Sequence, residues 1–350
     1  MPVRTTVEPS DLKTSGHFGK NCSKTVWTGA SSAIATAPVA GANPRQAGSG
    51  ADNRLILDNP QGLTTFNAGY MYSASGKIDL SGCTNLTSIS TVYVQLTSLN
   101  VNGCTSLTTF NCFDNLLTSL DVSGCTNLTT LNCYDNSLTS LNVSGLVNLT
   151  TLRCYENSLT SLNVSGLVNL TTLYCQRNNL TSLDVSGCTN LTSLQCYVNL
   201  LTSLDVSRLT NLDVLVCDNN DLTSLDVSGL VNLTSLNCSY NPLTSLDVSG
   251  LTNLTSLYCH NNPSLGGGLT GLSDLTKINV SKQIHIGQSG FSAAQLDALF
   301  ATLPDKTVLG GTGTWTIYIK QNPSSADTSG TTGCTQSIAT NRGWVVNTTN

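Results

Sequence analysis

LTTLNCYDNSLTSLNVSGLVN, residues 128–148, is the stretch that decides the fold, because near-identical copies of it stand on both sides along the chain. Eight cysteines mark the same place in eight copies, each 21 residues after the last: Cys112, Cys133, Cys154, Cys175, Cys196, Cys217, Cys238 and Cys259. A fixed period in the range of about 20–50 residues is the sequence mark of a solenoid. The chain is therefore expected to be a stack of similar coils.

Each copy contains two short alternations of apolar and polar residues. Successive side chains of a strand point to opposite faces, so Leu131 and Cys133 are expected inside and Tyr134 outside. A second short strand is expected at SLNVS, residues 140–144. Parallel coils about 4.8 Å apart would stack equivalent residues into ladders.

The repeat LxxLxCxxNxLxxLDVSGCxN resembles the leucine-rich repeat, LxxLxLxxN/CxL, with Cys in place of the third Leu. The resemblance spans residues 63–264, where degenerate copies begin at Leu63 and Leu86 and bring the total to about ten coils. It implies an α/β-type leucine-rich repeat solenoid of mostly short parallel strands with few helices.

Three regions are predicted: an N-terminal arm and cap over 1–62, the solenoid over 63–264, and a small α+β capping domain over 265–350. The arm is rich in Ala, Gly, Ser and Pro, with a strand expected near residues 54–58. A cap is expected because the last coil of a solenoid otherwise exposes its core. Its expected elements are a helix over 293–303 that Ser292 caps, a strand at 315–320, a short helix near 335–341 and a strand at 344–346. The end of the chain, with QNP, SIAT and GW, is similar to that of leucine-rich repeat surface proteins of Bacteroidetes-type bacteria and their phages.

The cysteine ladder has three possible interpretations: disulfides, metal ligands or small buried apolar side chains. A second column favours the last, because it interchanges cysteine with leucine: Cys83, Cys104, Cys125 and Cys188 against Leu146, Leu167, Leu209, Leu230 and Leu251. A free Cys packs as a small apolar residue. In-register neighbours about 4.8 Å apart also exceed the usual Cβ separation of a disulfide. We expect buried free thiols, which suits a reducing compartment.

Two polar columns are expected to be structural. One is an asparagine ladder, expected to satisfy backbone groups at the turn and to bond between stacked copies: Asn115, Asn136, Asn157, Asn178, Asn199, Asn220, Asn241 and Asn262. The other carries stacked acids: Asp184, Asp205, Asp226 and Asp247, with Asp121, Asn142 and Asn163 in the same column. Like charges so close repel unless they are solvated, hydrogen-bonded or bridged by a cation such as Ca²⁺. Bonding to nearby Ser and Thr is the favoured interpretation, and the cation remains an alternative.

The copies differ mainly at three positions, the residue before Cys and the two residues after it. These positions hold most of the tyrosines, and Tyr70, Tyr72 and Tyr93 fall in the matching stretch of the degenerate copies. Tyrosine gives a large contact area for little rotamer entropy, so binding surfaces favour it; the alternative is that exposed strand positions simply favour β-formers. The candidate ligand-binding residues, on the expected concave face, are Phe113, Tyr134, Arg153, Tyr155, Tyr174, Gln176, Tyr197, Asp218, Tyr240, Tyr258 and His260.

Composition and motifs argue against several functions. Residues 63–264 carry four Lys/Arg against twelve Asp/Glu, a net charge near −8 that disfavours nucleic acid as a partner. No run approaches the roughly 18 apolar residues of a membrane span. The three histidines, His17, His260 and His285, lack Cys, Ser or carboxylate partners at a catalytic spacing, so no enzyme, cofactor or metal is expected.

We therefore expect a non-enzymatic recognition protein that binds a cell-surface protein or glycan. The many thiols, the arm-like residues 1–62 and a start without an apolar signal segment favour a phage virion component, such as a receptor-binding or fibre protein. Such a protein would be assembled in the host cytoplasm, and the arm would contact other virion proteins. The alternatives are a bacterial surface adhesin, extracellular and with its leader removed, and a purely structural virion protein.

Overall fold

The computed structural model describes residues 63–68, 76–277, 280–310, 312–319 and 334–348, with the backbone of four short strands before them. These strands are β1 (Thr25–Val26), β2 (Ile34–Ala35), β3 (Pro44–Gln46) and β4 (Arg54–Leu57). Strand β4 lies where the sequence placed one. Apart from the backbone of these four strands, the arm lies outside the described residues, as do Tyr70 and Tyr72. The chain forms two compact units: the first runs to Leu170 and includes Arg177–Asn179, and the second holds Thr171–Gln176 and continues from Leu180.

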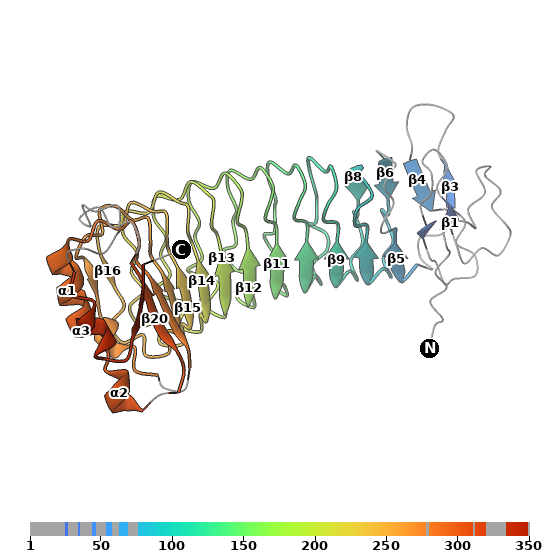
Figure 1. Ribbon diagram of the computed structural model, residues 1–350. Coiled ribbons are helices and arrows are strands. Elements are labelled where there is room, and N and C mark those ends of the chain that lie inside the picture. The colour runs from blue at the N-terminus through green and yellow to red at the C-terminus, as the bar shows by residue number, and fades with distance from the viewer. Residues whose placement is uncertain are drawn as a thin grey trace. The chain divides into compact units, whose positions relative to one another are not determined.

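The first unit is built on parallel strands that follow one another in chain order (Figure 1). They are β5 (Thr65–Asn67), β7 (Ser88–Ser90), β9 (Thr109–Asn111), β10 (Thr130–Asn132) and β11 (Thr151–Arg153). Their register is that of the repeat, since Leu131 lies opposite Phe110 on one side and Leu152 on the other. A second sheet joins β3 and β4 to β6 (Gly76–Asp79) and β8 (Leu96–Asn100).

The second unit repeats this arrangement and extends it past the last regular copy. Its strands are β12 (Thr172–Tyr174), β13 (Ser193–Gln195), β14 (Val214–Val216), β15 (Ser235–Asn237), β17 (Ser256–Tyr258), β19 (Lys282–His285), β20 (Trp315–Tyr318) and β21 (Val345–Asn347). Strand β19 pairs in parallel with β17, β20 with β19, and β21 with β20, so the sheet continues through the region predicted as a cap.

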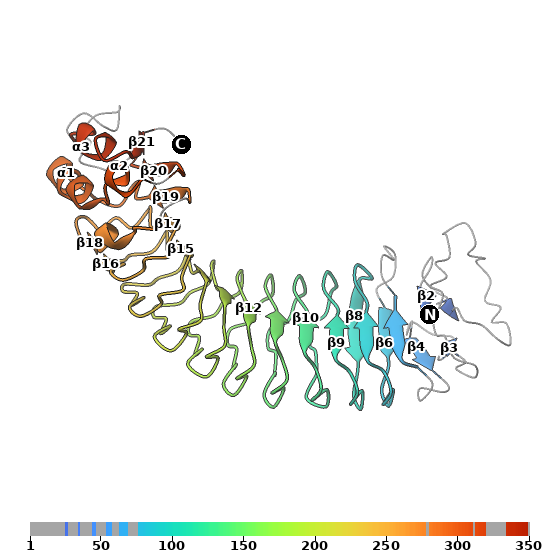
Figure 2. The same cartoon turned by 90° about the horizontal axis from the view of Figure 1, so that it is seen from below.

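Helices gather beside these last strands (Figure 2). They are η3 (Leu272–Asp274), α1 (Ala293–Thr302), α2 (Lys306–Leu309) and α3 (Ser337–Thr340), with the short pair β16 (Leu246–Asp247) and β18 (Leu269–Thr270) nearby in sequence. The predicted start of α1 is confirmed: Ser292 accepts a hydrogen bond from the Gln295 backbone, and the Gln295 side chain bonds back to Ser292, a reciprocal capping box.

The interior confirms the interpretation of both cysteine columns. Each of the twelve repeat cysteines is at most 1% exposed and is a free thiol, and the leucines that replace them in the second column are equally buried. Burial raises the pKa of thiols in both columns, to about 12 for Cys83 and Cys125, because a thiolate would lose its hydration. They therefore pack as neutral apolar side chains, and the predicted solenoid fold is confirmed.

The asparagine ladder satisfies the backbone, as predicted, but its members do so individually. The Asn220 side chain donates to the carbonyls of Cys217 in its own coil and Cys196 in the preceding one, each at 3.1 Å. Its oxygen accepts from the Leu201 backbone at 3.0 Å. One amide thus fastens two coils through their main chains, in place of the expected bond between neighbouring asparagines.

The second strand expected in every coil was wrong for most copies. It forms as β6 and β8 in the first coils and as β16 in a late one. Between them, isolated parallel β-bridges pair Asp121 with Asn142 and Asn142 with Asn163.

The acid column does not explain the difference. Each Asp or Asn of that column accepts a hydrogen bond from the backbone of the serine two residues on, as Asp205 does from Ser207 at 2.9 Å. Asp247 in β16 accepts the same bond from Ser249 at 3.0 Å, so this local turn is compatible with both forms of the coil.

Candidate binding surface

The strand face is our name for the outward residues of the parallel strands together with the residue after each cysteine position. In the first unit its main feature is an aromatic stack. Phe113 and Tyr134 stack with ring centroids 4.3 Å apart, and Tyr134 and Tyr155 with centroids 4.2 Å apart, both pairs within 10° of parallel. Tyr93 meets Phe113 edge-on at 5.8 Å. The three predicted residues therefore form one continuous surface, because stacked coils bring equivalent positions into contact.

A polar row runs beside this stack, on the residues before each cysteine. Asn132 donates to Asn111 at 2.7 Å, and Arg153 donates to Asn132 at 3.3 Å. These bonds hold the predicted site residue Arg153 along the face. The pKa of Tyr134 is raised by burial and then by Tyr155, so its phenol stays protonated at neutral pH.

The second residue after each cysteine lies in a turn of left-handed backbone. Asp114, Asp135 and Glu156 have φ of 56°, 53° and 52°, and the equivalent residues of the second unit do the same. Each of these acids directly follows an aromatic residue of the stack in the sequence. Burial raises the pKa of Asp114, and the neighbouring charge of Asp135 adds to the effect.

The second unit carries a different aromatic cluster at its far end. His285 stacks on Tyr258 at 4.4 Å and on Tyr318 at 3.9 Å, with the rings within 20° of parallel. The Tyr258 hydroxyl lies 2.9 Å from the Gln283 side-chain oxygen, to which it donates. This stack uses the position before the cysteine, whereas the stack of the first unit uses the position after it.

His260 borders that stack and meets Tyr240 edge-on at 5.3 Å. Burial lowers the pKa of His260, which the Asp218 carboxylate partly opposes, and lowers that of His285 to about 4 with a contribution from His260. Both imidazoles are therefore neutral at pH 7. His260 Nδ1 and His285 Nε2 are buried atoms without a hydrogen-bond partner among the described residues.

The remaining predicted residues have varied surroundings. Asp218 accepts from Asn237 at 2.9 Å and from Asn219 at 2.7 Å, and its pKa is raised by burial. The Ser193 hydroxyl donates to the Tyr174 hydroxyl at 3.3 Å, and Tyr197 is half-buried. Gln176 departs from expectation, since it is only 5% exposed and offers little area to a ligand.

His285 and Tyr318 belong to the strand face and were missed from the sequence. Both follow the strand register, since Tyr258 lies opposite His285 and His285 opposite Tyr318. The signal was present: Ile-His-Ile and Ile-Tyr-Ile repeat the alternation of Leu-Tyr-Cys at residues 257–259 with isoleucine in place of Leu and Cys. The loss of the 21-residue spacing hid it.

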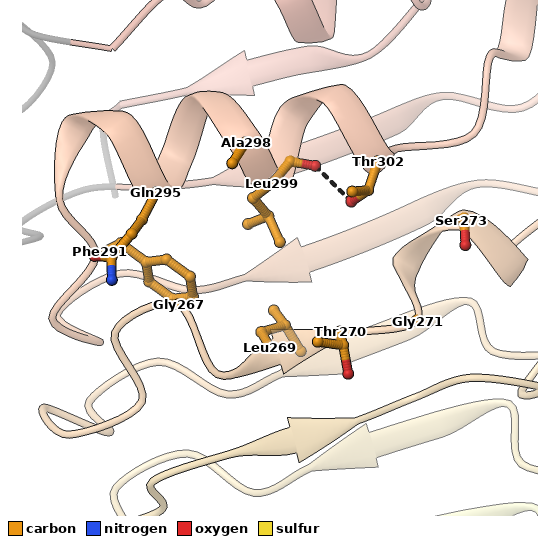
Figure 3. Close-up of a pocket in the computed structure, with 10 residues that line it drawn as sticks. All are labelled: Gly267, Leu269, Thr270, Gly271, Ser273, Phe291, Gln295, Ala298, Leu299 and Thr302. Atoms are coloured by element: carbon orange, nitrogen blue, oxygen red, sulfur yellow. Dashed lines mark hydrogen bonds between the residues drawn. The ribbon is translucent and has the colours of Figure 1, made fainter.

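A small cavity of about 230 Å³ lies in the second unit, between α1 and the loop that carries β18 (Figure 3). Its walls are Gly267, Leu269, Thr270, Gly271, Ser273, Phe291, Gln295, Ala298, Leu299 and Thr302. None of these side chains is an acid, a base or a thiol, and Gln295 is engaged in the helix cap. The cavity therefore offers packing space and little chemistry.

The acid column shows the bonding that the sequence favoured. Hydrogen bonds from the following serines lower the pKa of Asp184, Asp205, Asp226 and Asp247, which stabilises them as separate carboxylates. Within the described part of the chain, no group of three or more His, Cys, Asp or Glu has the geometry of a metal site. No helix among those residues is long and apolar enough to cross a membrane.

Repeat, register and buried columns together define a leucine-rich repeat solenoid, and comparisons with known proteins agree. The family described as leucine-rich repeats (two copies) matches residues 231–277. Among solved structures, the functional domain of InlJ from Listeria monocytogenes, described as including a cysteine ladder, is similar at 28% identity and a TM-score of 0.54, over 76% of each chain. The internalin InlF of the same organism is similar at 20% identity and a TM-score of 0.46, over 66% of this chain and 84% of that one. No curated protein matches the sequence.

Proposed function

We propose that this protein is a non-enzymatic recognition protein that binds another macromolecule on a cell surface through its strand face. One observation carries the proposal: the copies vary on this face while their other positions repeat almost unchanged, and the variable positions hold the stacked aromatic side chains. Rigid aromatic side chains lose little entropy on binding. The backbone beneath them is fixed by the strands and the asparagine ladder, so the surface is already organised.

The likeness to InlJ, with its own cysteine ladder, supports a bacterial surface adhesin as the setting for this role. The buried thiols and the Ala/Gly/Ser/Pro-rich residues 1–62 support a phage virion component instead, with the arm contacting other virion proteins. The stacked aromatic residues support a binding face over a purely structural virion protein. The adhesin and the virion component both use the strand face in the same way, so one binding experiment tests the role common to them.

The test uses the full chain in whole-cell binding and on a glycan array. Replacing Tyr134, Tyr155 and Tyr174 together with alanine should abolish binding, because it removes contact area from the face without touching the core. The matched control is Asp184→Asn with Asp205→Asn, changes that the column already contains at Asn142 and Asn163. Unchanged binding by a folded triple variant would rule out the strand face as the binding surface.

A further inference from the structure

In the aromatic stack of the first unit, each aromatic residue is followed in the sequence by a carboxylate residue. Phe113 is followed by Asp114, Tyr134 by Asp135, and Tyr155 by Glu156. We call these six residues the acidic aromatic strip. The backbones of neighbouring turns are bonded in register, from Asp114 N to Tyr134 O at 3.1 Å and from Asp135 N to Tyr155 O at 3.0 Å. Equivalent residues therefore recur at the coil spacing, about 4.8 Å.

The charge of the strip is only partly compensated. Arg177 lies 3.6 Å from Glu156 in an exposed ion pair. Neither Asp114 nor Asp135 has a cationic partner among the residues that the structure describes. Their mutual repulsion is one cause of the raised pKa of Asp114. Arg153 also lies on this part of the face, so three acids stand against two arginines, and the net charge of −1 favours a cationic ligand over an anionic one.

The stacking also decides which ring surfaces a ligand can reach. Tyr134 has a ring on each side at 4.3 and 4.2 Å, so both of its faces are covered. The C–H groups of a sugar would seek the electron-rich ring face, and at Tyr134 that face is covered on both sides. What remains accessible is a row of ring edges and hydroxyls beside the carboxylates. Lysine and arginine side chains fit such a strip, because their apolar stems cover hydrocarbon while their charged heads stay in water near the acids.

On the basis of the proposed function, we infer that the ligand of the first unit is a protein. A lysine- or arginine-rich segment of that protein binds the acidic aromatic strip. Positively charged heads would lie along Asp114, Asp135 and Glu156, and the stems would cover Phe113, Tyr134 and Tyr155. The inference assigns this strip a basic protein partner in place of a glycan.

The test measures binding of the full chain to a labelled oligolysine peptide and to its oligoglutamate counterpart. The wild type should bind oligolysine. Asp114→Asn with Asp135→Asn should weaken that binding about tenfold, since two exposed ion pairs are worth about 0.5–1 kcal/mol each. Asparagine already occupies the same left-handed position at Asn219 and Asn261, so the double variant should fold.

The matched control, Asp184→Asn with Asp205→Asn, changes the net charge by the same amount in a different column and should bind oligolysine as the wild type does. Equal weakening by both double variants would mean attraction to overall charge and would overturn the inference, as would unchanged binding by the strip variant. Whole-cell binding separates the two proposals. If the triple tyrosine variant loses cell binding while the strip variant keeps both cell and oligolysine binding, the recognition role stands and the basic segment is wrong.

Discussion

The two aromatic clusters lie on equivalent strand faces but consist of different side chains with different neighbours. In the first unit, Phe113, Tyr134 and Tyr155 stack beside exposed carboxylates, and in the second, His285 stacks between Tyr258 and Tyr318 beside a second imidazole. The first is a surface of phenyl and phenol rings whose following residues are acids. The second contains histidines kept neutral by burial. One repeat therefore presents different chemistry by changing only the residues beside a constant core.

The largest expected effect is a loss of stability at alkaline pH, and it should be the same in both units. Each unit holds six buried repeat cysteines. Their folded pKa is raised above the unfolded value of 9.0, to about 12 for Cys83 and Cys238, so this stability is complete below pH 9 and is lost as pH rises toward 12. At pH 10 the loss is about 1.4 kcal/mol per thiol, roughly 7–8 kcal/mol in each unit.

We therefore expect cooperative unfolding between about pH 9 and 10, comparable to a whole domain's stability. Hydrogen exchange resolved by peptide would follow each unit separately during the titration. Replacing one thiol per unit, Cys133→Val and Cys217→Val, should reduce the pH dependence equally in both. Loss of protection in one unit alone would show that the cores are not equivalent.

Acid should destabilise the second unit more than the first. The folded pKa of His285 is lowered from 6.5 to about 4, so its contribution is complete above pH 6.5 and is lost as pH falls toward 4. The expected cost at pH 4.5 is about 1–2 kcal/mol after allowance for the solvent screening of a half-buried imidazole, confined to the second unit. Urea unfolding followed by fluorescence of the buried Trp315 and Trp344 reports on that unit.

His285→Phe is the matched variant, because it keeps a ring in the stack and removes the titration of this imidazole. Its loss between pH 6.5 and 4.5 should be smaller than that of the wild type, and the remaining loss should come from His260, whose pKa burial also lowers. The acids of the serine-bonded column titrate lower, since hydrogen bonds lower the pKa of Asp184 and Asp205 from 3.8. A wild-type loss that persists unchanged in His285→Phe would assign the acid sensitivity to other groups.

Much of this architecture was accessible from the sequence, because the repeat supplies its own alignment. The buried columns, the asparagine ladder, the helix that Ser292 caps and the aromatic positions all follow from residues that recur with a constant spacing. Interchange of Cys with Leu decided the role of the thiols. These predictions succeed because packing between coils permits few residue types at each inward position.

The failures share a cause, which is that spacing says little about contacts between coils. Strands β19 and β20 lie at irregular spacing, so His285 and Tyr318 were not recognised as face residues. The second strand was overpredicted, since the alternation of apolar and polar residues does not show whether neighbouring coils pair through their backbones at that place. The burial of Gln176 could not be predicted from the repeat pattern either, because it depends on neighbouring side chains.

A smaller effect tests the stacks directly. Tyr134→Ala removes the middle ring of the first-unit stack, and it should cost about 1–2 kcal/mol because two parallel contacts are lost. Tyr134→Phe should be nearly neutral in stability, as Phe113 already occupies the same position one coil earlier. Equilibrium urea unfolding compares the two. A Tyr134→Phe cost equal to that of alanine would place the stabilisation in the hydroxyl and not in the stacked rings.

The smallest predicted effect is a gain, and it distinguishes the turns of the two units. Val198 has φ of 52° in the second unit, where its branched side chain crowds the backbone, whereas Asp114 and Asp135 fill the equivalent turns of the first. Val198 is 41% exposed, and its backbone donates to Asp218 O at 3.0 Å whatever the side chain, so Val198→Asn should relieve strain without losing a contact. We expect about 1 kcal/mol of added stability from the substitution, and a similar loss from the reverse change, Asp135→Val. Thermal unfolding of both variants measures the pair. Stability changes of opposite sign and similar size would show that the turn has the same conformation and the same residue preference in both units. The acids of the acidic aromatic strip would then suit the backbone conformation at their positions. An unchanged stability in Val198→Asn would mean that the turn accepts a branched side chain without strain.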